Sequence, residues 1–195
     1  MSSFSTPHRS DARRNRERIL VAAAEALAED PSAGLERIAR RAGVSRPTLY
    51  AHFAGREALL DALTARSVTE MTAALRAASP DQGPADEAMV RVLRAAWRTI
   101  GRYRGLVIVN QRLEPAELRA RTAPATGLVG ELVRRGQRSG AFDPELPAAW
   151  LLGAVVDLIH AASRQVSAGL LDPAEAELML LRTAAAVLTS HRAAG

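Results

Sequence analysis

One short segment, residues 46–52, carries side chains whose types and spacing suit contact with a nucleic acid. We expect its outward-facing positions to be Arg46, Pro47, Thr48, Tyr50 and His52. An arginine can bind O6 and N7 of a guanine through two parallel hydrogen bonds. A helix that faced only solvent would seldom display Tyr and His beside Arg without an acidic partner. The pattern therefore favours a helix that faces phosphate groups.

For three of these positions the residue type suggests a particular contact with DNA. Arg46 is the first candidate for recognising a base, and a simple phosphate contact is the alternative. Pro47 lacks a backbone N–H but offers an apolar surface to a thymine methyl group. Tyr50 either contacts DNA or packs against a neighbouring helix.

Two short helices joined by a tight turn would position this row. They are expected over residues 35–42 and 46–52, with Gly43 in the left-handed conformation that glycine adopts at little cost. Ser45 is a natural N-cap for the second helix. The apolar positions expected to face inward are Leu35, Ile38, Ala39, Ala42, Val44, Leu49 and Phe53. These features predict a helix-turn-helix, which can place side chains into the major groove of DNA.

Helical periodicity continues through the rest of the chain, and no segment has the alternation typical of a strand. Further helices are expected over residues 12–29, 56–78, 86–102, 106–113, 115–139 with an interruption at Pro124, 147–168 and 173–191. We expect an all-α fold. It would comprise a disordered arm over residues 1–11, a three-helix DNA-binding domain over 12–63, and a helical ligand-binding and dimerisation domain over 64–195.

The segment AGVSRPTLYAHF, residues 42–53, resembles the DNA-binding signature of the tetracycline-repressor (TetR) family. Ile38–Ala39 before it and REALL at residues 56–60 after it strengthen the resemblance, which covers roughly residues 12–63. Beyond this region the chain agrees with the family only in the number and spacing of its helices. The resemblance implies a homodimer that binds a near-palindromic double-stranded DNA operator, usually as a repressor released by a small-molecule effector.

The resemblance also assigns individual residues. Thr48, Tyr50 and His52 match positions that contact DNA, the last two mostly at phosphates. Arg56 takes the place of a Lys at the start of the fourth helix, where the helix N-terminus also favours a phosphate.

Residues in and after the first helix also bear on the expected phosphate contacts. Gly34 departs from the Thr or Ser that usually caps the second helix and touches a phosphate, although Ser32 could substitute. Arg13, Arg14 and Arg16 could follow the phosphate backbone or enter the minor groove, and a solvated helix start is the alternative. The formal net charge of +5 supports DNA binding only modestly.

The C-terminal domain is expected to dimerise and to bind an effector. Its last two helices carry apolar faces, and in the family the corresponding pair forms a four-helix bundle with a second copy. Candidate pocket residues are Met71, Leu75, Met89, Leu93, Trp97, Asn110, Gln111 and His160. Ordinary packing is the alternative for each of them. Asp157 interrupts an apolar stretch and could face the dimer seam, pair with an arginine such as Arg164, or bind a cationic ligand.

Composition and motifs argue against other classes of protein. The chain has no Cys, four scattered His and no phosphate-cradling glycine loop, so we expect no metal site, no cofactor and no enzymatic activity. The N-terminus lacks a secretory signal and no segment is long and apolar enough for a membrane span, which predicts a cytoplasmic protein. The alternative function is a helical interaction module that binds an acidic partner surface without reading a DNA sequence.

Overall fold

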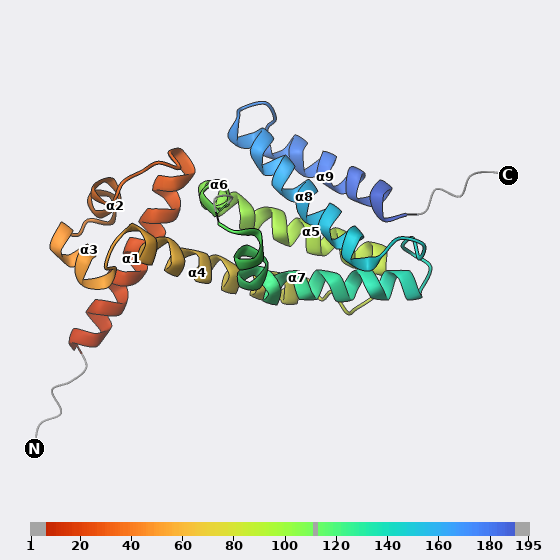
Figure 1. Cartoon of the computed structure of the whole chain (residues 1–195), viewed down its shortest axis with the longest axis horizontal. Helices are drawn as coiled ribbons and strands as arrows, with labels where there is room; N and C mark the ends of the chain where they lie inside the picture. Colours follow the sequence, from red (N-terminus) through yellow and green to blue (C-terminus); the bar gives the residue numbers. More distant parts are fainter. Residues whose placement is uncertain (1–6, 111–112, 190–195) are drawn as a thin grey trace, which may run out of the picture. The chain divides into compact units, whose positions relative to one another are not determined.

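The computed structural model describes residues 7–110 and 113–189, which form nine α-helices and no strand (Figure 1). The all-α class is therefore confirmed. The helices divide into two compact units. The first comprises Met1–Ser67 and Arg102–Leu113, and the second comprises Val68–Gly101 and Glu114–Gly195. Helix α4, Arg56–Ala77, contributes residues to both.

The first unit is built around helix α1, Pro7–Glu29, which packs against three other helices. These are α2 (Leu35–Ala42), α3 (Arg46–His52) and α6 (Arg104–Asn110). The buried side chains of α1 recur at three- and four-residue spacing, as a helix with one apolar face requires. The shared core includes Ile19, Ala23, Leu27, Ile38, Leu49, Phe53, Leu59, Leu63 and Leu106.

Helix α6 approaches α1 at backbone distance. A Cβ atom at Gly105 would lie 1.8 Å from the carbonyl oxygen of Leu27, so only glycine fits there. Tyr103 and Leu106 on either side are buried in the same core. Because of this packing, residues 102–113 belong to the first unit, whereas the sequence-based boundary after residue 63 placed them in the C-terminal domain.

The second unit contains α5 (Ala85–Arg102), α7 (Pro115–Arg138), α8 (Ala148–Ser167) and α9 (Pro173–Leu188). Helix α8 packs against both α7 and α9. The Trp97 indole N–H donates to the carbonyl of Pro173 at 3.2 Å, which ties α5 to the start of α9. Asp172 caps α9 by accepting the N–H groups of Glu175 and Ala174, and these bonds lower the pKa of its carboxyl.

Helix α7 corrects one expectation, because it continues through Pro124 without interruption. Proline removes the hydrogen bond to the carbonyl four residues earlier, which belongs to Ala120. Ala120 and Pro124 are both exposed. Water can therefore reach the freed carbonyl, which reduces the cost of keeping the helix intact.

Three other helix boundaries differ from the sequence-based expectation. Helix α1 begins at Pro7, so residues 7–11 of the expected arm are helical, whereas residues 1–6 lie outside the described part. Proline suits this position because its missing N–H would have no partner in a first turn. Helix α6 begins at Arg104, earlier than expected, and α9 ends at Leu188. Within the described residues, no helix has the length and hydrophobicity that crossing a membrane requires.

Candidate nucleic-acid interface

The start of helix α3 is held by Ser45, as the sequence predicts. The Ser45 hydroxyl oxygen accepts the backbone N–H of Thr48 at 3.2 Å and lies 2.8 Å from the Thr48 hydroxyl. Pro47 occupies the first turn. These local contacts fix the N-terminal end of a helix of only seven residues, which would have little stability by itself.

The inner face of α3 anchors it to the first unit. Leu49 is 1% exposed and Phe53 is 3% exposed, which confirms the prediction that both lie in the core. The Arg16 guanidinium lies over the Phe53 ring, 5.3 Å from its centroid, within the range of a cation–π interaction. Arg16, one of the three N-terminal arginines with an expected DNA contact, therefore supports α3 within the protein.

The outer face carries the predicted row. Arg46, Pro47 and Tyr50 are exposed, and Thr48 and His52 are half-buried. Tyr50 is 46% exposed, so much of its side chain is accessible to a DNA duplex. The five side chains form one accessible surface over the buried anchors.

The turn before α3 depends on two residues. Gly43 adopts the left-handed conformation, with φ +64°, as expected. Arg18 of α1 donates to the carbonyl oxygens of Ala42 at 2.6 Å and Gly43 at 3.3 Å. A cationic donor at the C-terminal end of α2 satisfies carbonyls that the helix leaves free. No local sequence pattern indicates this role for Arg18, because its acceptors lie 24 and 25 residues later in the chain.

Arg56 has hydrogen-bond partners within the protein. Its guanidinium donates to the backbone carbonyls of Ala33 and Pro31, the latter at 3.1 Å. The side chain is half-buried and ties the start of α4 to the loop between α1 and α2. Arg56 therefore positions this loop within the protein, and its expected phosphate contact stays a prediction.

The start of α2 lacks the side-chain cap common in the family. Gly34 occupies the N-cap position. Ser32, the expected substitute, instead donates its hydroxyl to Asp30 at 2.6 Å. This bond and the Ser32 backbone N–H lower the pKa of the Asp30 carboxyl.

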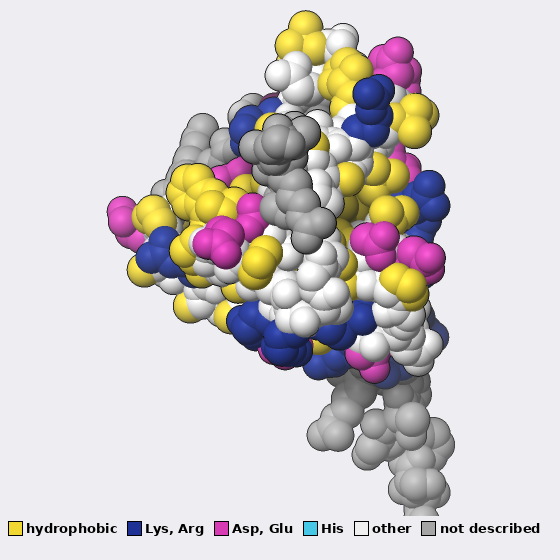
Figure 2. Space-filling view, turned by 90° about the vertical axis from the view of Figure 1, so that its right-hand side faces the viewer, with side chains coloured by type: hydrophobic (Ala, Val, Ile, Leu, Met, Phe, Trp, Pro, Cys, Tyr) yellow, Lys and Arg dark blue, Asp and Glu magenta, His cyan; other side chains and the backbone are white. Residues whose placement is uncertain are grey.

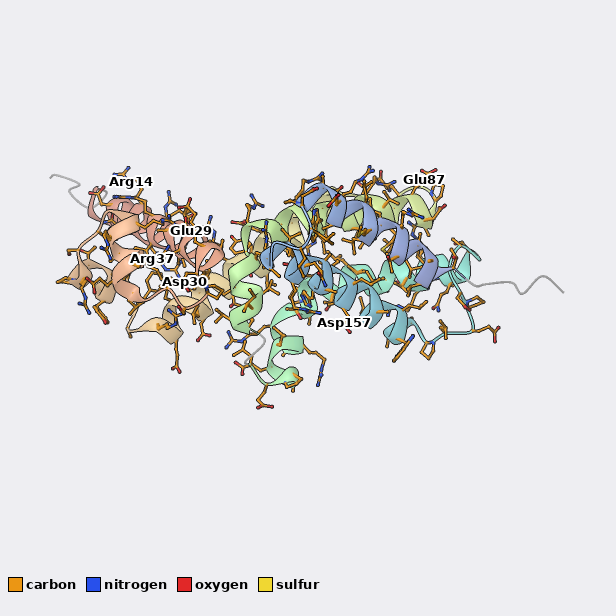
Figure 3. All side chains as sticks on the ribbon, turned by 90° about the horizontal axis from the view of Figure 1, so that it is seen from above. Arg14, Glu29, Asp30, Arg37, Glu87 and Asp157 are labelled. Carbon is orange, nitrogen blue, oxygen red and sulfur yellow. The ribbon has the colours of Figure 1, made fainter. Side chains whose placement is uncertain are left out.

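A network of charges joins α2 to the end of α1 (Figure 3). Arg41 and Arg37 donate to Glu29 at 2.6 and 2.8 Å, and Arg37 also reaches Asp30 at 3.3 Å. The hydrogen bond from Arg41 is the largest cause of the lowered pKa of Glu29. These arginines of α2 therefore have intrachain partners.

Three of the remaining predicted DNA contacts are solvent-exposed arginines. Arg14 pairs with Asp11 within α1. Arg13 is exposed, with no ion pair or hydrogen bond to the rest of the described chain. Arg46 lies 3.9 Å from Glu36 of α2, measured from Nη1 to Oε2, and both side chains are more than half exposed.

Most of the predicted pocket residues of the second unit lie in its core. Leu75, Met89, Leu93 and Trp97 are buried in the core of the second unit, and Met71 is half-buried. A surface cleft of about 470 Å³ is present in the second unit, but its lining includes none of the predicted pocket residues. For the four buried residues, packing in the core is the observed role.

The two polar pocket candidates at the end of α6 lie elsewhere. The Asn110 amide donates to the Thr64 hydroxyl at 3.2 Å, which joins α6 to α4 within the first unit. Gln111 lies outside the described residues. Asn110 therefore has a structural partner, and an effector contact at Asn110 would have to compete with it.

His160 and Asp157 lie on α8 in the second unit. His160 is half-buried, and burial lowers the pKa of its imidazole despite the nearby Asp157 carboxylate. Asp157 is exposed on α8 (Figure 3). Hydrophobic side chains are also open at the surface (Figure 2). On α8 and α9 they include Trp150, Leu178 and Met179.

Residues 19–63, which include the helix-turn-helix, match the family described as bacterial regulatory proteins, tetR family. The chain is also 34% identical over 140 residues to the HTH-type transcriptional repressor LfrR of Mycolicibacterium smegmatis. That alignment covers 70% of this chain and 71% of LfrR.

Solved structures agree over a greater length. The crystal structure of LfrR from Mycobacterium smegmatis in complex with proflavine has a TM-score of 0.75 at 25% identity and covers 91% of this chain and 98% of that chain. PfmR from Thermus thermophilus shares the fold, with a TM-score of 0.71 at 22% identity over 91% of this chain and 97% of that chain. LfrR is a transcriptional repressor, in agreement with the expectation of a protein that is not an enzyme. The chain belongs to the tetR family of bacterial regulatory proteins.

Proposed function

We propose that the protein binds a near-palindromic DNA operator as a homodimer and represses transcription until a small-molecule effector releases it. The observation that carries the proposal is the accessible row on α3, held over the buried Leu49 and Phe53. A helix anchored on one side and polar on the other can enter the major groove without losing its own packing. Such a protein would act in the cytoplasm.

In this proposal the residues of α3 make different contacts with DNA. Arg46 reads a guanine, and Pro47 offers its ring to a thymine methyl group. Tyr50 and His52 donate to phosphates and set the register of the helix on the duplex. The Thr48 hydroxyl, already oriented by Ser45 at 2.8 Å, is available at the same surface.

The exposed apolar side chains of α8 and α9 support the homodimer. Trp150 is 68% exposed, Leu178 63% and Met179 52%. Large apolar side chains that stay open to solvent on neighbouring helices commonly mark a protein–protein interface. A second copy would cover them and set the two α3 helices about 34–36 Å apart, one turn of DNA.

The LfrR structure in complex with proflavine supports an effector for this chain as well. Because Leu93 and Trp97 are packed in the core of the second unit, an effector that entered there would have to displace them. Ligand-linked repacking of this kind would account for operator release, since a ligand shifts an equilibrium only through different affinities for its two states. Proflavine is the first probe to titrate.

The proposal is tested by selecting bound duplexes from a random DNA pool. The expected result is one enriched sequence with two-fold symmetry, bound with an affinity that falls steeply as salt rises. A pool without an enriched sequence would reject operator recognition. Salt-dependent binding without sequence preference would favour the helical interaction module.

A further inference from the structure

Glu36 is an acidic residue beside the proposed base-reading arginine. It lies in the first turn of α2, and its Oε2 is 3.9 Å from Nη1 of Arg46 at the start of α3. The two side chains are 69% and 60% exposed. The Glu29–Asp30 pair, by contrast, is engaged by Arg37 and Arg41 at the end of α1. Within the described residues, Arg46 is the only ion-pair partner of Glu36.

This ion pair contributes little to folding. An exposed pair at such a distance is weakly stabilising, because water solvates both charges and salt screens their attraction. A carboxylate close to a DNA-binding surface also repels phosphates. The first turn of α2 favours a negative charge, because it lies at the N-terminus of the helix. Non-specific affinity for DNA, by contrast, gives no reason for an acid beside Arg46, whereas sequence discrimination does.

The geometry of the ion pair would allow Glu36 to orient the side chain of Arg46. A guanidinium has five N–H donors in a rigid plane, so a carboxylate on one edge leaves other donors free for a base. An arginine without such a partner can swing to the nearest phosphate, which is a contact that all sequences offer. Excluding water from the groove strengthens the attraction between Glu36 and Arg46.

We infer that Glu36 is a specificity-determining residue that positions Arg46 for a guanine and keeps it from the phosphates. The inference rests on the proposed function, and it assigns Arg46 to a base contact instead of a phosphate contact. Glu36 lowers the affinity for DNA in general and raises the preference for one base in each half-site.

The test uses Glu36→Gln, which removes the charge and keeps the shape of the side chain. Glu87→Gln is the matched control, because Glu87 is an exposed glutamate in the first turn of α5, in the other unit (Figure 3). Dissociation constants are measured over a range of salt concentrations. The duplexes are the selected operator, the same operator with another base in place of the guanine assigned to Arg46, and an unrelated duplex.

Relative to Glu87→Gln, we expect Glu36→Gln to bind the unrelated duplex about fivefold more tightly and to discriminate against the replaced guanine about fivefold less. The salt dependence on unrelated DNA should steepen by about one unit of log–log slope, as for one added phosphate contact. In an Arg46→Ala background, Glu36→Gln should leave discrimination unchanged.

Three other results would contradict either the proposed function or the inference about Glu36. If the wild-type protein selects no sequence, the proposed function is wrong. If it does select one and Glu36→Gln keeps full discrimination, Glu36 does not position Arg46. If Glu36→Gln lowers discrimination equally in the Arg46→Ala background, Glu36 acts without Arg46 and the inference is also overturned. Circular dichroism and thermal unfolding should match wild type, since both side chains are exposed.

Discussion

Arginine side chains that look alike in the sequence have different roles in the first unit. Arg18 and Arg56 donate to backbone carbonyls and hold the turn before α3 and the loop before α2. Arg46 has no such acceptor, and its only ion-pair partner among the described residues is the exposed Glu36. These hydrogen bonds fix where the two guanidinium groups lie, so Arg18 and Arg56 could contact DNA only from those positions and with their remaining N–H groups.

At the residue scale, we expect Arg46→Ala and Tyr50→Ala to weaken operator binding in different ways. Loss of Arg46 should reduce discrimination at one position in each half-site by about 1–3 kcal/mol, because a bidentate contact to a base is lost. Loss of Tyr50 should weaken binding to all duplexes by about 1 kcal/mol, because a phosphate contact carries no sequence information. Dissociation constants for the operator and its single-base variants separate the two patterns. An equal loss for every sequence in Arg46→Ala would assign Arg46 to a phosphate.

Local chemistry made much of the interface predictable. Ser45, Gly43 and the inward pair Leu49 and Phe53 follow from capping preferences, from the left-handed turn and from helical periodicity. The partners of Arg56 and Asn110 lie 23 to 46 residues away, as does the carbonyl held by Arg18. Periodicity within one helix contains no information about such acceptors, so the sequence could not distinguish these structural side chains from binding ones.

At the scale of helices, type was easier to predict than extent. The expected break at Pro124 did not occur, because the freed carbonyl is at an exposed residue. The assignment of α6 to the C-terminal domain also failed. In the sequence, Gly105 falls between the helices expected over residues 86–102 and 106–113. In the structure it lies within α6, where the backbone of Leu27 in α1 leaves no room for a Cβ atom.

We expect Gly105→Ala to destabilise the first unit. The new Cβ would lie 1.8 Å from the Leu27 carbonyl oxygen and 2.2 Å from its carbon, and backbone atoms cannot move aside as a side-chain end can. Overpacking of this kind costs about 1–3 kcal/mol. Urea unfolding followed by circular dichroism measures the loss.

Gly127→Ala is the control for this substitution. Gly127 lies within α7, and a Cβ there would meet no atom within 4 Å. Alanine is the better helix former, so this variant should be neutral or more stable by up to about 1 kcal/mol. Equal midpoints for Gly105→Ala and the wild-type protein would mean that α6 does not pack against α1 as described.

At the scale of the whole molecule, a single chain presents one proposed recognition helix, α3, and leaves apolar groups uncovered on α8 and α9. A near-palindromic site needs two recognition helices related by two-fold symmetry. One self-complementary surface would meet both requirements. The exposed Asp157 lies on α8 as well, and in a dimer it would need a partner such as an arginine of the second copy.

We therefore expect the protein to have twice its chain mass of 20.8 kDa when measured by light scattering at micromolar concentration. Leu178→Glu should give a monomer, because it places a charge where an apolar side chain, 63% exposed in the single chain, would be buried. Val21→Glu is the control, since Val21 is an exposed apolar residue of α1 and the same charge change there should leave the dimer intact. A monomeric Leu178→Glu variant should also lose most operator affinity, because each half-site would then be bound separately. If both variants have the mass of a dimer, the interface does not include Leu178. If the wild-type protein is a monomer, the proposal of a symmetric operator is wrong.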